Sequence, residues 1–518
     1  MTTLTMKFGG TSVGSVQAIE QAADIVLEQA QKWERLVVVV SAMSGVTNAL
    51  TQGALTAASG GPSTGSGPGG PSTGSGPGGP STGSGPGGQT QRSTVADLRV
   101  RHYRVVDELL NGERAQLLAA VDEYLDEFDA FCRSIYVLGE VTPRAMDAIT
   151  SLGERINARI LAALLRQRGA RSEAIDATEL IITDETFQDA MPLMDATRAR
   201  VSARLNPLLD EGVIPIVTGF MGATENGVTT TLGRGGSDYS AAILGDCLDA
   251  DEVWIWTDVD GVMTADPRIV PDARIIPILS YGEVGEMAYF GAKVLHPRTI
   301  RPVVERGIPL WVKNTFNPTC PGTCIVCEPQ NTPGAVKAVT AIKGLSMVTV
   351  EGRGMMGVPG IAARTFAAVA SQGASVLMIS QASSEQSICF VIPTEVAPAV
   401  IHAVEAEMAL ELARRDVDQI RSQDDVVIVT AVGAGLRETP GVAARIFGAL
   451  GKGDINVTAI AQGSSDCSIS LVVAADDAAE AVRQVHTQVV INGDGQAPVP
   501  EAKRSEKPAP NDTQGENK

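Results

Sequence analysis

Short runs of apolar residues alternate with longer amphipathic stretches over the first 260 residues of the chain. The run 36–40 (LVVVV) is continuously apolar, which is typical of a strand buried on both faces of a parallel sheet. The other strands and helices that this pattern predicts are strands at 4–8, 174–176, 212–220 and 252–256, and helices at 16–31, 94–110, 112–137 and 151–167. Such alternation predicts an α/β fold, a mainly parallel sheet with helices on both faces.

From about residue 336 the pattern changes to two copies of a shorter unit. The segment 360–366 (GIAARTF) recurs as 441–447 (GVAARIF), and 379–384 (ISQASS) recurs as 460–465 (IAQGSS). Each copy reads strand, helix, two strands and a second helix, a split βαβ arrangement. The predicted first strands and last helices are 347–350 with 397–412, and 426–430 with 478–485. We expect two α+β units after the α/β part, with boundaries at 1–335, 336–418 and 424–489, or with the two units interleaved.

Two segments lack the apolar residues that a core needs. Between residues 60 and 88 the nonapeptide PSTGSGPGG occurs three times, and the stretch 490–518 is polar. Segments of this composition cannot offset the entropy lost on ordering. We therefore expect a flexible surface insertion at 60–88 and a disordered tail at 490–518.

The charge balance restricts the partners. The 518 residues contain 41 basic and 60 acidic side chains, a net charge of −19, and no long basic cluster. Nucleic acid and anionic membrane surfaces are therefore not expected partners. No apolar run reaches the length of a membrane span and no signal peptide pattern begins the chain, so we expect a soluble cytoplasmic protein.

Three of the seven cysteines are close together in sequence. Cys320, Cys324 and Cys327 have the short spacing of metal ligands, but the second pair of a zinc site is missing. We interpret them as free thiols and expect no metal bound by the protein alone.

Glycine, hydroxyl and charged residues follow several predicted strands. They include Lys7 with Gly9 and Gly10, the stretch 41–47, and the stretch 229–240 (TTTLGRGGSDYS) before a helix. Ligands bind at the carboxyl ends of parallel strands, so these segments predict one crevice, and the last of them is a candidate phosphate loop. In this phosphate loop Ser237 and Asp238 can cap the next helix. An ordinary glycine-rich turn between a strand and a helix is the alternative. Glu154 near a predicted helix start is either a cap or the partner of a substrate ammonium.

Six motifs occur together in one order, and the chain resembles the aspartate kinase family through them. They are KFGGTS from Lys7, SAMSGVTN from Ser41, SLGER from Ser151, TTTLGRGGSDYSA from Thr229, TDVDGVMTADPR from Thr257 and FGAKVLHP from Phe290. The resemblance implies an amino-acid-kinase fold. It also implies transfer of the γ-phosphoryl group of ATP, with Mg²⁺, to the β-carboxylate of L-aspartate, the first step of lysine, threonine and methionine biosynthesis.

The resemblance also implies roles for individual residues. Lys7 and Asp238 are the expected catalytic pair, and Met263 stands where the family commonly has tyrosine. The other expected site residues are, for phosphate, Gly9, Gly10, Gly235 and Gly236; for aspartate, Ser41, Thr47, Glu154, Arg234 and Ser237; and for the nucleotide, Thr257, Asp258, Met263, Arg268, Lys293 and Val294.

The two repeated units resemble ACT domains, which pair edge to edge and bind amino acids. Gln381 and Gln462 occupy equivalent positions and are the expected effector-binding residues. The sequences around them are similar to the threonine-sensitive, bifunctional branch of the family, which implies threonine as effector and lysine as second choice. A role in homo-oligomer formation alone is the alternative for the repeats. For the whole chain, the alternatives are a kinase of another carboxylate and a non-catalytic amino-acid sensor.

Overall fold

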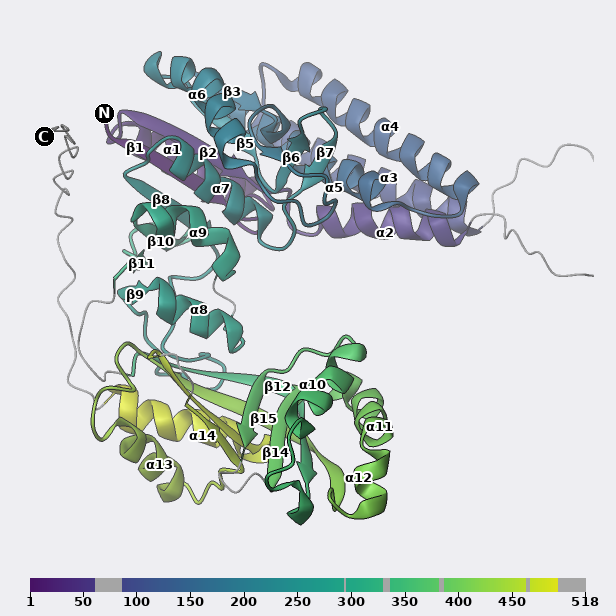
Figure 1. Cartoon of the computed structure of the whole chain (residues 1–518). Coiled ribbons are helices and arrows are strands. Elements are labelled where there is room, and N and C mark those ends of the chain that lie inside the picture. The colour runs from purple at the N-terminus through teal and green to yellow at the C-terminus, as the bar shows by residue number, and fades with distance from the viewer. Residues whose placement is uncertain (61–85, 293–294, 329–335, 382–385, 463–465, 492–518) are drawn as a thin grey trace, which may run out of the picture.

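The computed structural model of the chain describes residues 1–60, 86–292, 295–328, 336–381, 386–462 and 466–491. Figure 1 shows two bodies, one built from the described residues up to 328 and one from those after 335. The expected surface insertion at 60–88 and the tail at 490–518 lie largely outside the described residues. In the described part, no helix combines the length and the apolar character needed to cross a membrane.

An eight-stranded sheet forms the centre of the first body. Its strands lie in the order β3-β5-β2-β1-β8-β10-β11-β9, and all neighbours are parallel except β10 and β11. Their bounds are β1 Thr3–Phe8, β2 Arg35–Val40, β3 Ser172–Ile175, β5 Ile214–Thr218, β8 Glu252–Thr257, β9 Ile278–Ser280, β10 Leu310–Asn314 and β11 Thr323–Val326. The mainly parallel sheet that the apolar runs predict is confirmed.

Helices cover both faces of this sheet because alternate residues of its strands enter two separate cores. Val38 and Val40 of β2 belong to a core with α1 to α5, whereas Val37 and Val39 belong to a core with α6 to α9. The helices are α1 Val16–Ala30, α2 Val46–Ser59, α3 Pro86–Leu109, α4 Arg114–Leu138, α5 Pro143–Gln167, α6 Met194–Asp210, α7 Gly236–Cys247, α8 Tyr281–Tyr289 and α9 Pro297–Arg306. A small sheet of β4 (Ile182–Thr183), β6 (Met221–Thr224) and β7 (Thr229–Thr231) precedes α7.

One helix starts earlier than its sequence pattern predicts. The helix expected at 151–167 is α5, which begins at Pro143 after the N-cap residue Thr142. Glu154 therefore lies three turns inside the helix, and its interpretation as an N-terminal cap is wrong. Proline at the first helical position and the threonine cap were the local signals for the true start.

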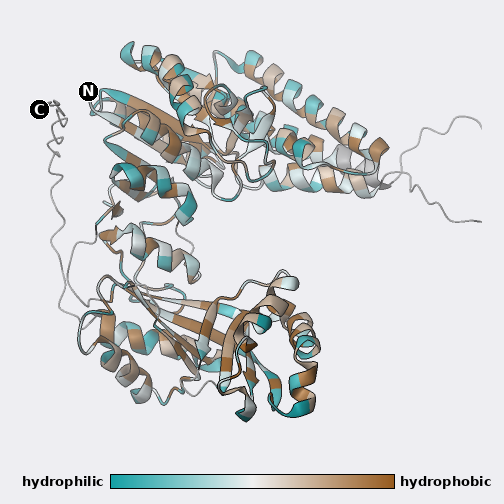
Figure 2. Cartoon of the chain, in the orientation of Figure 1, coloured by the Kyte–Doolittle hydropathy of each residue, from teal (hydrophilic) through white to brown (hydrophobic). Residues whose placement is uncertain are grey.

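The two repeated units share one six-stranded antiparallel sheet in the order β13-β14-β12-β15-β17-β16. Figure 2 shows its strands as largely hydrophobic, with mixed helices beside them. Each copy follows the predicted order of strand, helix, two strands and helix. The elements are β12 Ala338–Glu351, α10 Ile361–Ser371, β13 Met378–Gln381, β14 Ser387–Pro393, α11 Ala397–Glu407, α12 Ala409–Arg414, β15 Gln419–Val432, α13 Val442–Lys452, β16 Ala459–Ala461, β17 Ser468–Ala474, α14 Ala478–Val485 and the π-helical η5 His486–Ile491.

The loop after β8 joins the two bodies. Ala265 and Val270 of this loop are buried in the same core as Val442 of α13 and Val482 of α14. The Thr264 hydroxyl lies 2.8 Å from Nε2 of the buried His486. A loop of the first body is thus packed as part of the second.

A buried carboxylate makes the second connection. Glu283 of α8 is fully buried; one of its oxygens lies 2.9 Å from Nζ of Lys337, and the other accepts the N–H of Ala434 at 2.8 Å. Both partners belong to the second body, next to β12 and β15. A buried acid with an opposite charge and a backbone donor holds two elements firmly in one arrangement.

Candidate active site

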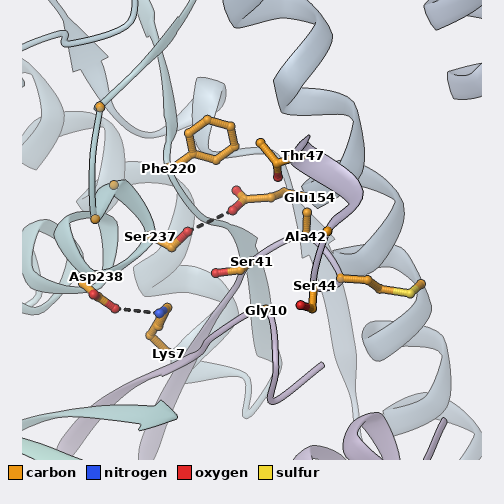
Figure 3. Close-up of a pocket in the computed structure, with 15 residues that line it drawn as sticks. Lys7, Gly10, Ser41, Ala42, Ser44, Thr47, Glu154, Phe220, Ser237 and Asp238 are labelled. Atoms are coloured by element: carbon orange, nitrogen blue, oxygen red, sulfur yellow. Dashed lines mark hydrogen bonds and ion pairs between the residues drawn. The ribbon is translucent and has the colours of Figure 1, made fainter. Parts of the chain in front are cut away.

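The carboxyl ends of β1, β2 and β5 and the N-terminus of α7 surround a cavity of ≈ 340 Å³ (Figure 3). Most of the residues that sequence reasoning selected for catalysis, phosphate and substrate line it. They are Lys7, Gly10, Ser41, Thr47, Glu154, Gly235, Gly236, Ser237 and Asp238. Segments separated by more than two hundred residues therefore meet in one place.

Lys7 and Asp238 form an ion pair on one side of this cavity. Nζ of Lys7 lies 2.6 Å from Oδ1 of Asp238, and 11% and 17% of the two side chains remain exposed. Lys7 comes from β1 and Asp238 from the first turn of α7, so the pair ties the strand to the helix. Such a pair, largely shielded from water, presents an oriented positive charge to an anion in the cavity.

Gly9 and Gly10 bring the backbone close to this lysine. The N–H of Gly9 donates to the carbonyl of Trp256 at 3.1 Å. A Cβ atom at Gly9 would lie 3.4 Å from Nζ of Lys7, and one at Gly10 would lie 3.1 Å from the carbonyl oxygen of Ala42. Gly9 does not line the cavity itself, whereas Gly10 does.

The loop before α7 uses glycine where its conformation requires it. Gly235 is the N-cap of α7 with φ of +72°, and a Cβ at Gly236 would lie 2.6 Å from Cβ of Phe220. No side chain caps this helix, so the expected capping role of Ser237 and Asp238 is wrong. Both side chains point into the cavity instead, where the free N–H groups of the helix start attract negative charge.

Glu154 is the buried acid of the site. It is 2% exposed, and its Oε1 accepts the hydroxyl of Ser237 at 2.9 Å. Burial raises the pKa of Glu154 to about 8, because the Ser237 hydroxyl, the charge of Lys7 and nearby backbone amides offset only part of the cost of desolvation. Its Oε2 is buried without a hydrogen bond of normal geometry to any described residue. An acid held in this way is ready to accept a donor from a ligand.

Arg234 is placed differently from its neighbours. It is exposed in the loop between Gly233 and Gly235, which both line the cavity, but its own side chain does not. Among the described residues it has no hydrogen bond or ion pair. The guanidinium is therefore available at the mouth of the loop.

The residues expected at the nucleotide follow β8. Thr257 ends this strand, and its hydroxyl donates to the exposed Asp258 at 3.2 Å. Met263 forms an isolated bridge with Ile275, and the exposed Arg268 pairs with Asp266 at 2.6 Å. None of these residues lines the cavity of Lys7. Lys293 and Val294 lie outside the described residues.

Two residues that shape the site were missed by sequence reasoning. Phe220 lines the cavity, and only its position directly after a strand end could have indicated it. Asp147 is buried in α5 and accepts the N–H and the hydroxyl of Thr231 at 3.0 and 2.7 Å, which fixes the strand before the glycine loop. No local signal identifies such a partner across 84 residues.

The three cysteines with metal-ligand spacing form no disulfide. Cys320, Cys324 and Cys327 are unpaired, and burial raises the pKa of Cys324 to about 12. Within the described residues, no group of three histidine, cysteine or acidic side chains could hold a metal ion.

Comparisons with known proteins identify the family of the chain. Residues 2–314 match the model of the amino acid kinase family, and residues 348–408 and 429–489 each match an ACT domain. The chain is 37% identical over 494 residues to a chloroplastic bifunctional aspartokinase/homoserine dehydrogenase 1 of Arabidopsis thaliana, covering 94% of this chain and 51% of that protein. It is 32% identical over 505 residues to the chloroplastic aspartokinase 1 of the same plant, covering 95% and 81%. The chain thus spans about half the length of the first of these relatives.

Solved structures are similar over nearly the whole chain. E. coli aspartokinase III in complex with aspartate and ADP (R-state) has a TM-score of 0.71 at 28% identity, covering 94% of this chain and 99% of that one. The same enzyme in complex with lysine and aspartate (T-state) has a TM-score of 0.73 at 28% identity, with the same coverage. The fold class expected from the sequence is therefore confirmed.

Proposed function

Because the chain belongs to the amino acid kinase family and, within it, to the aspartokinases, we propose that it transfers the γ-phosphoryl group of ATP to the β-carboxylate of L-aspartate. The observation that carries this proposal is that a cationic group and a buried acid line the same cavity. Lys7 supplies a positive charge, and Glu154 supplies a buried acid with an unpartnered oxygen. The complex of E. coli aspartokinase III with aspartate and ADP supports the same pair of ligands.

The proposed orientation of aspartate follows from the charges around the cavity. The substrate ammonium donates to Oε2 of Glu154, and Ser41, Thr47 and Ser237 offer hydroxyl groups to the rest of the molecule. Arg234 at the mouth of the loop has the planar fork that suits a substrate carboxylate. The β-carboxylate is then directed toward Lys7.

The reaction needs charge neutralisation more than acid–base chemistry. A carboxylate acceptor is already ionised at neutral pH, so no general base is required. In agreement, no histidine occurs among the described residues that line the cavity. Lys7, oriented by Asp238, and the amides of Gly10 and Gly235 stabilise the charge on the phosphoryl oxygens in the transition state. Gly9 and Gly236, whose N–H groups already donate to the carbonyls of Trp256 and Gly233, let the two loops approach the phosphate closely.

We place the nucleotide along the loop after β8, at Thr257, Asp258, Met263 and Arg268. Lys293 and Val294, the other two residues proposed for the nucleotide, lie outside the described residues. The exposed Asp258 at the strand end fits a hydrated Mg²⁺, because this ion keeps several waters and binds through few carboxylates and the substrate phosphates. Bound there, Mg²⁺ would neutralise phosphate charge. The softer Met263 replaces an aromatic contact to the nucleotide without affecting the chemistry.

An assay of aspartyl phosphate with Mg-ATP tests the proposed function. We expect turnover with L-aspartate, and kcat/KM lower with L-glutamate by roughly 10- to 200-fold, the usual effect of one misplaced methylene group. ADP release and trapping of the acyl phosphate as its hydroxamate are the two measurements. A preference for glutamate would identify a kinase of another carboxylate, and absence of turnover would identify an amino-acid sensor.

We further propose feedback inhibition by threonine, with lysine as second choice, through units with boundaries at 336–418 and 424–489. Gln381 at the end of β13 and Gln462 just after β16 are exposed at equivalent positions of the two edge strands. Exposed edge strands are suited to pairing in a homo-oligomer. Threonine is supported by the higher identity to the bifunctional relatives, and lysine by the complex of E. coli aspartokinase III.

Titration of each amino acid separately tests the effector. In Gln381→Ala and Gln462→Ala we expect the half-inhibitory concentration of threonine to rise roughly two- to tenfold, because each loses a hydrogen bond to the effector. Gln372→Ala, at an exposed glutamine after α10, is the matched control and should not change it. Unchanged inhibition in both variants would show that Gln381 and Gln462 do not bind the effector.

A further inference from the structure

All four tryptophans of the chain lie together, away from the candidate active site. Trp254 and Trp256 of β8 have ring centroids 6.0 Å apart, and Trp33 packs edge-on to Trp254 at 6.1 Å. Nζ of Lys313 lies 4.9, 5.8 and 5.1 Å from the ring centroids of Trp254, Trp256 and Trp311. We name Trp33, Trp254, Trp256, Trp311 and Lys313 the tryptophan cluster.

All members of the cluster except Trp311 line a cavity of ≈ 390 Å³ that shares no residue with the cavity of Lys7. It lies on the face of the sheet covered by α1, because Trp256 belongs to the core of α1 to α5 while Val253 and Ile255 belong to the core on the other face. Its volume falls within the roughly 300–1,000 Å³ of small-molecule sites. The remaining walls come from α1, with Ile25, Glu28 and Gln29, and from Pro318.

Two opposite charges in this cavity are not paired with each other. Glu28 and Lys32 at the rim form their own ion pair at 2.6 Å. Glu252 and Lys313 face the same cavity, but among the described residues neither makes an ion pair. Burial is the main cause that raises the pKa of Glu252 and lowers that of Lys313, and the opposite charge of the other group offsets part of each shift.

The existing contacts of these groups leave bonding capacity in the cavity. Trp254 donates its indole N–H to Oε2 of Glu252, and Lys313 donates one hydrogen to the carbonyl of Pro321 at 2.8 Å. An ammonium has three donors, so two remain. Trp256 is 2% exposed, and its indole N–H has no partner among the described residues. Because this nitrogen has less than 1 Å² of accessible surface, it is not available to a ligand, and the bonding capacity of the cavity comes from Lys313 and Glu252.

We propose that this cavity binds a zwitterionic α-amino acid with an apolar side chain. The ligand carboxylate accepts from Lys313, the ligand ammonium donates to Glu252, and the side chain lies against the indole rings that line the cavity. A ligand with both charges satisfies both unpaired groups, whereas an inorganic anion would leave Glu252 unpaired. The site is independent of the effector-binding residues Gln381 and Gln462.

Tryptophan emission tests this proposal, because every tryptophan of the chain belongs to the cluster. L-Leucine should change the emission of the full-length protein in a saturable way. Its analogues with one charge, 4-methylpentanoate and 3-methylbutylamine, should bind at least roughly tenfold more weakly, because each lacks one charge-assisted contact. No saturable change with leucine, or equal affinity for 4-methylpentanoate, would overturn the proposal.

Three variants locate the site. Lys313→Met and Glu252→Gln keep the side-chain length and should each weaken leucine binding at least roughly tenfold, while Lys343→Met, at an exposed lysine outside the cavity, should leave it unchanged. Thermal unfolding shows whether each variant is folded. If Lys313→Met does not fold, leucine binding by Glu252→Gln tests the assignment. Leucine binding that is unchanged in a folded Lys313→Met or Glu252→Gln protein would contradict the assignment. Since no kinase assay is used, the result is separate from the proposed activity.

Discussion

Lys7→Ala is expected to lower kcat by roughly 10²- to 10³-fold or more, the usual cost of removing one preorganised positive donor from a transition state. Nζ of Lys7 is the cationic group that the described cavity presents beside the glycine backbone, 2.6 Å from Asp238. Without it, charge developing on the transferring phosphoryl oxygens is balanced only by backbone amides and the metal. Initial rates with saturating aspartate and Mg-ATP measure the loss.

Two controls separate catalysis from folding in that experiment. Lys32→Ala removes an exposed lysine just after α1 and should retain full turnover. Removal of Lys7 also leaves Asp238 without its ion pair, so cooperative thermal unfolding of the variant must be verified. A folded Lys7→Ala protein that keeps the full rate would show that Lys7 does not contact the transferring phosphoryl group.

Glu154→Gln is expected to raise the KM for aspartate by roughly 10- to 100-fold, because an amide replaces a charge-assisted acceptor of the substrate ammonium. The effect on kcat should be smaller, since the ammonium is distant from the reacting carboxylate. Steady-state kinetics with varied aspartate measure both constants. Glu225→Gln, at an exposed glutamate of the loop after β6, is the control. Equal KM values in the two variants would exclude Glu154 from the aspartate site.

The same variant should change how stability depends on pH. Burial raises the pKa of Glu154 from 4.5 to about 8, so between these values the folded protein binds a proton that the unfolded chain has released. Its contribution to the free energy of unfolding is therefore full below pH 4.5 and is lost as the pH rises to about 8. Glutamine does not ionise, so Glu154→Gln should lose less thermal stability than the parent protein between these pH values. If the unfolding midpoints of Glu154→Gln and the parent protein changed in parallel across this pH range, the expectation would be contradicted.

Local signals were sufficient to predict most of the fold. The run 36–40 is β2, and the glycines and hydroxyls after β1 and β2 do meet at one edge, because parallel strands bring their carboxyl ends together. The internal repeat likewise predicts the order of elements in both copies. These features depend on residues that are near one another in the chain.

Features that depend on distant partners could not be predicted. Glu154 was assigned to a helix start because the predicted helix began at residue 151. Its real environment comes from Ser237, 83 residues away. Strands β12 and β15 extend well beyond the predicted 347–350 and 426–430, since each pairs along most of its length with the other. The tryptophan cluster depends on the register of β8 with β10, which the sequence alone does not reveal.

The loop after β8 has a consequence for synthesis of the chain. Thr264 lies 222 positions before the histidine that it contacts, and Ala265 and Val270 lie in a core completed by α13 and α14. On the ribosome, the strands on both sides of this loop can pair long before its own packing partners have been made. Nucleotide binding should therefore be the last property that a nascent chain acquires, and chains truncated before α14 should lack it even where their parallel sheet has formed.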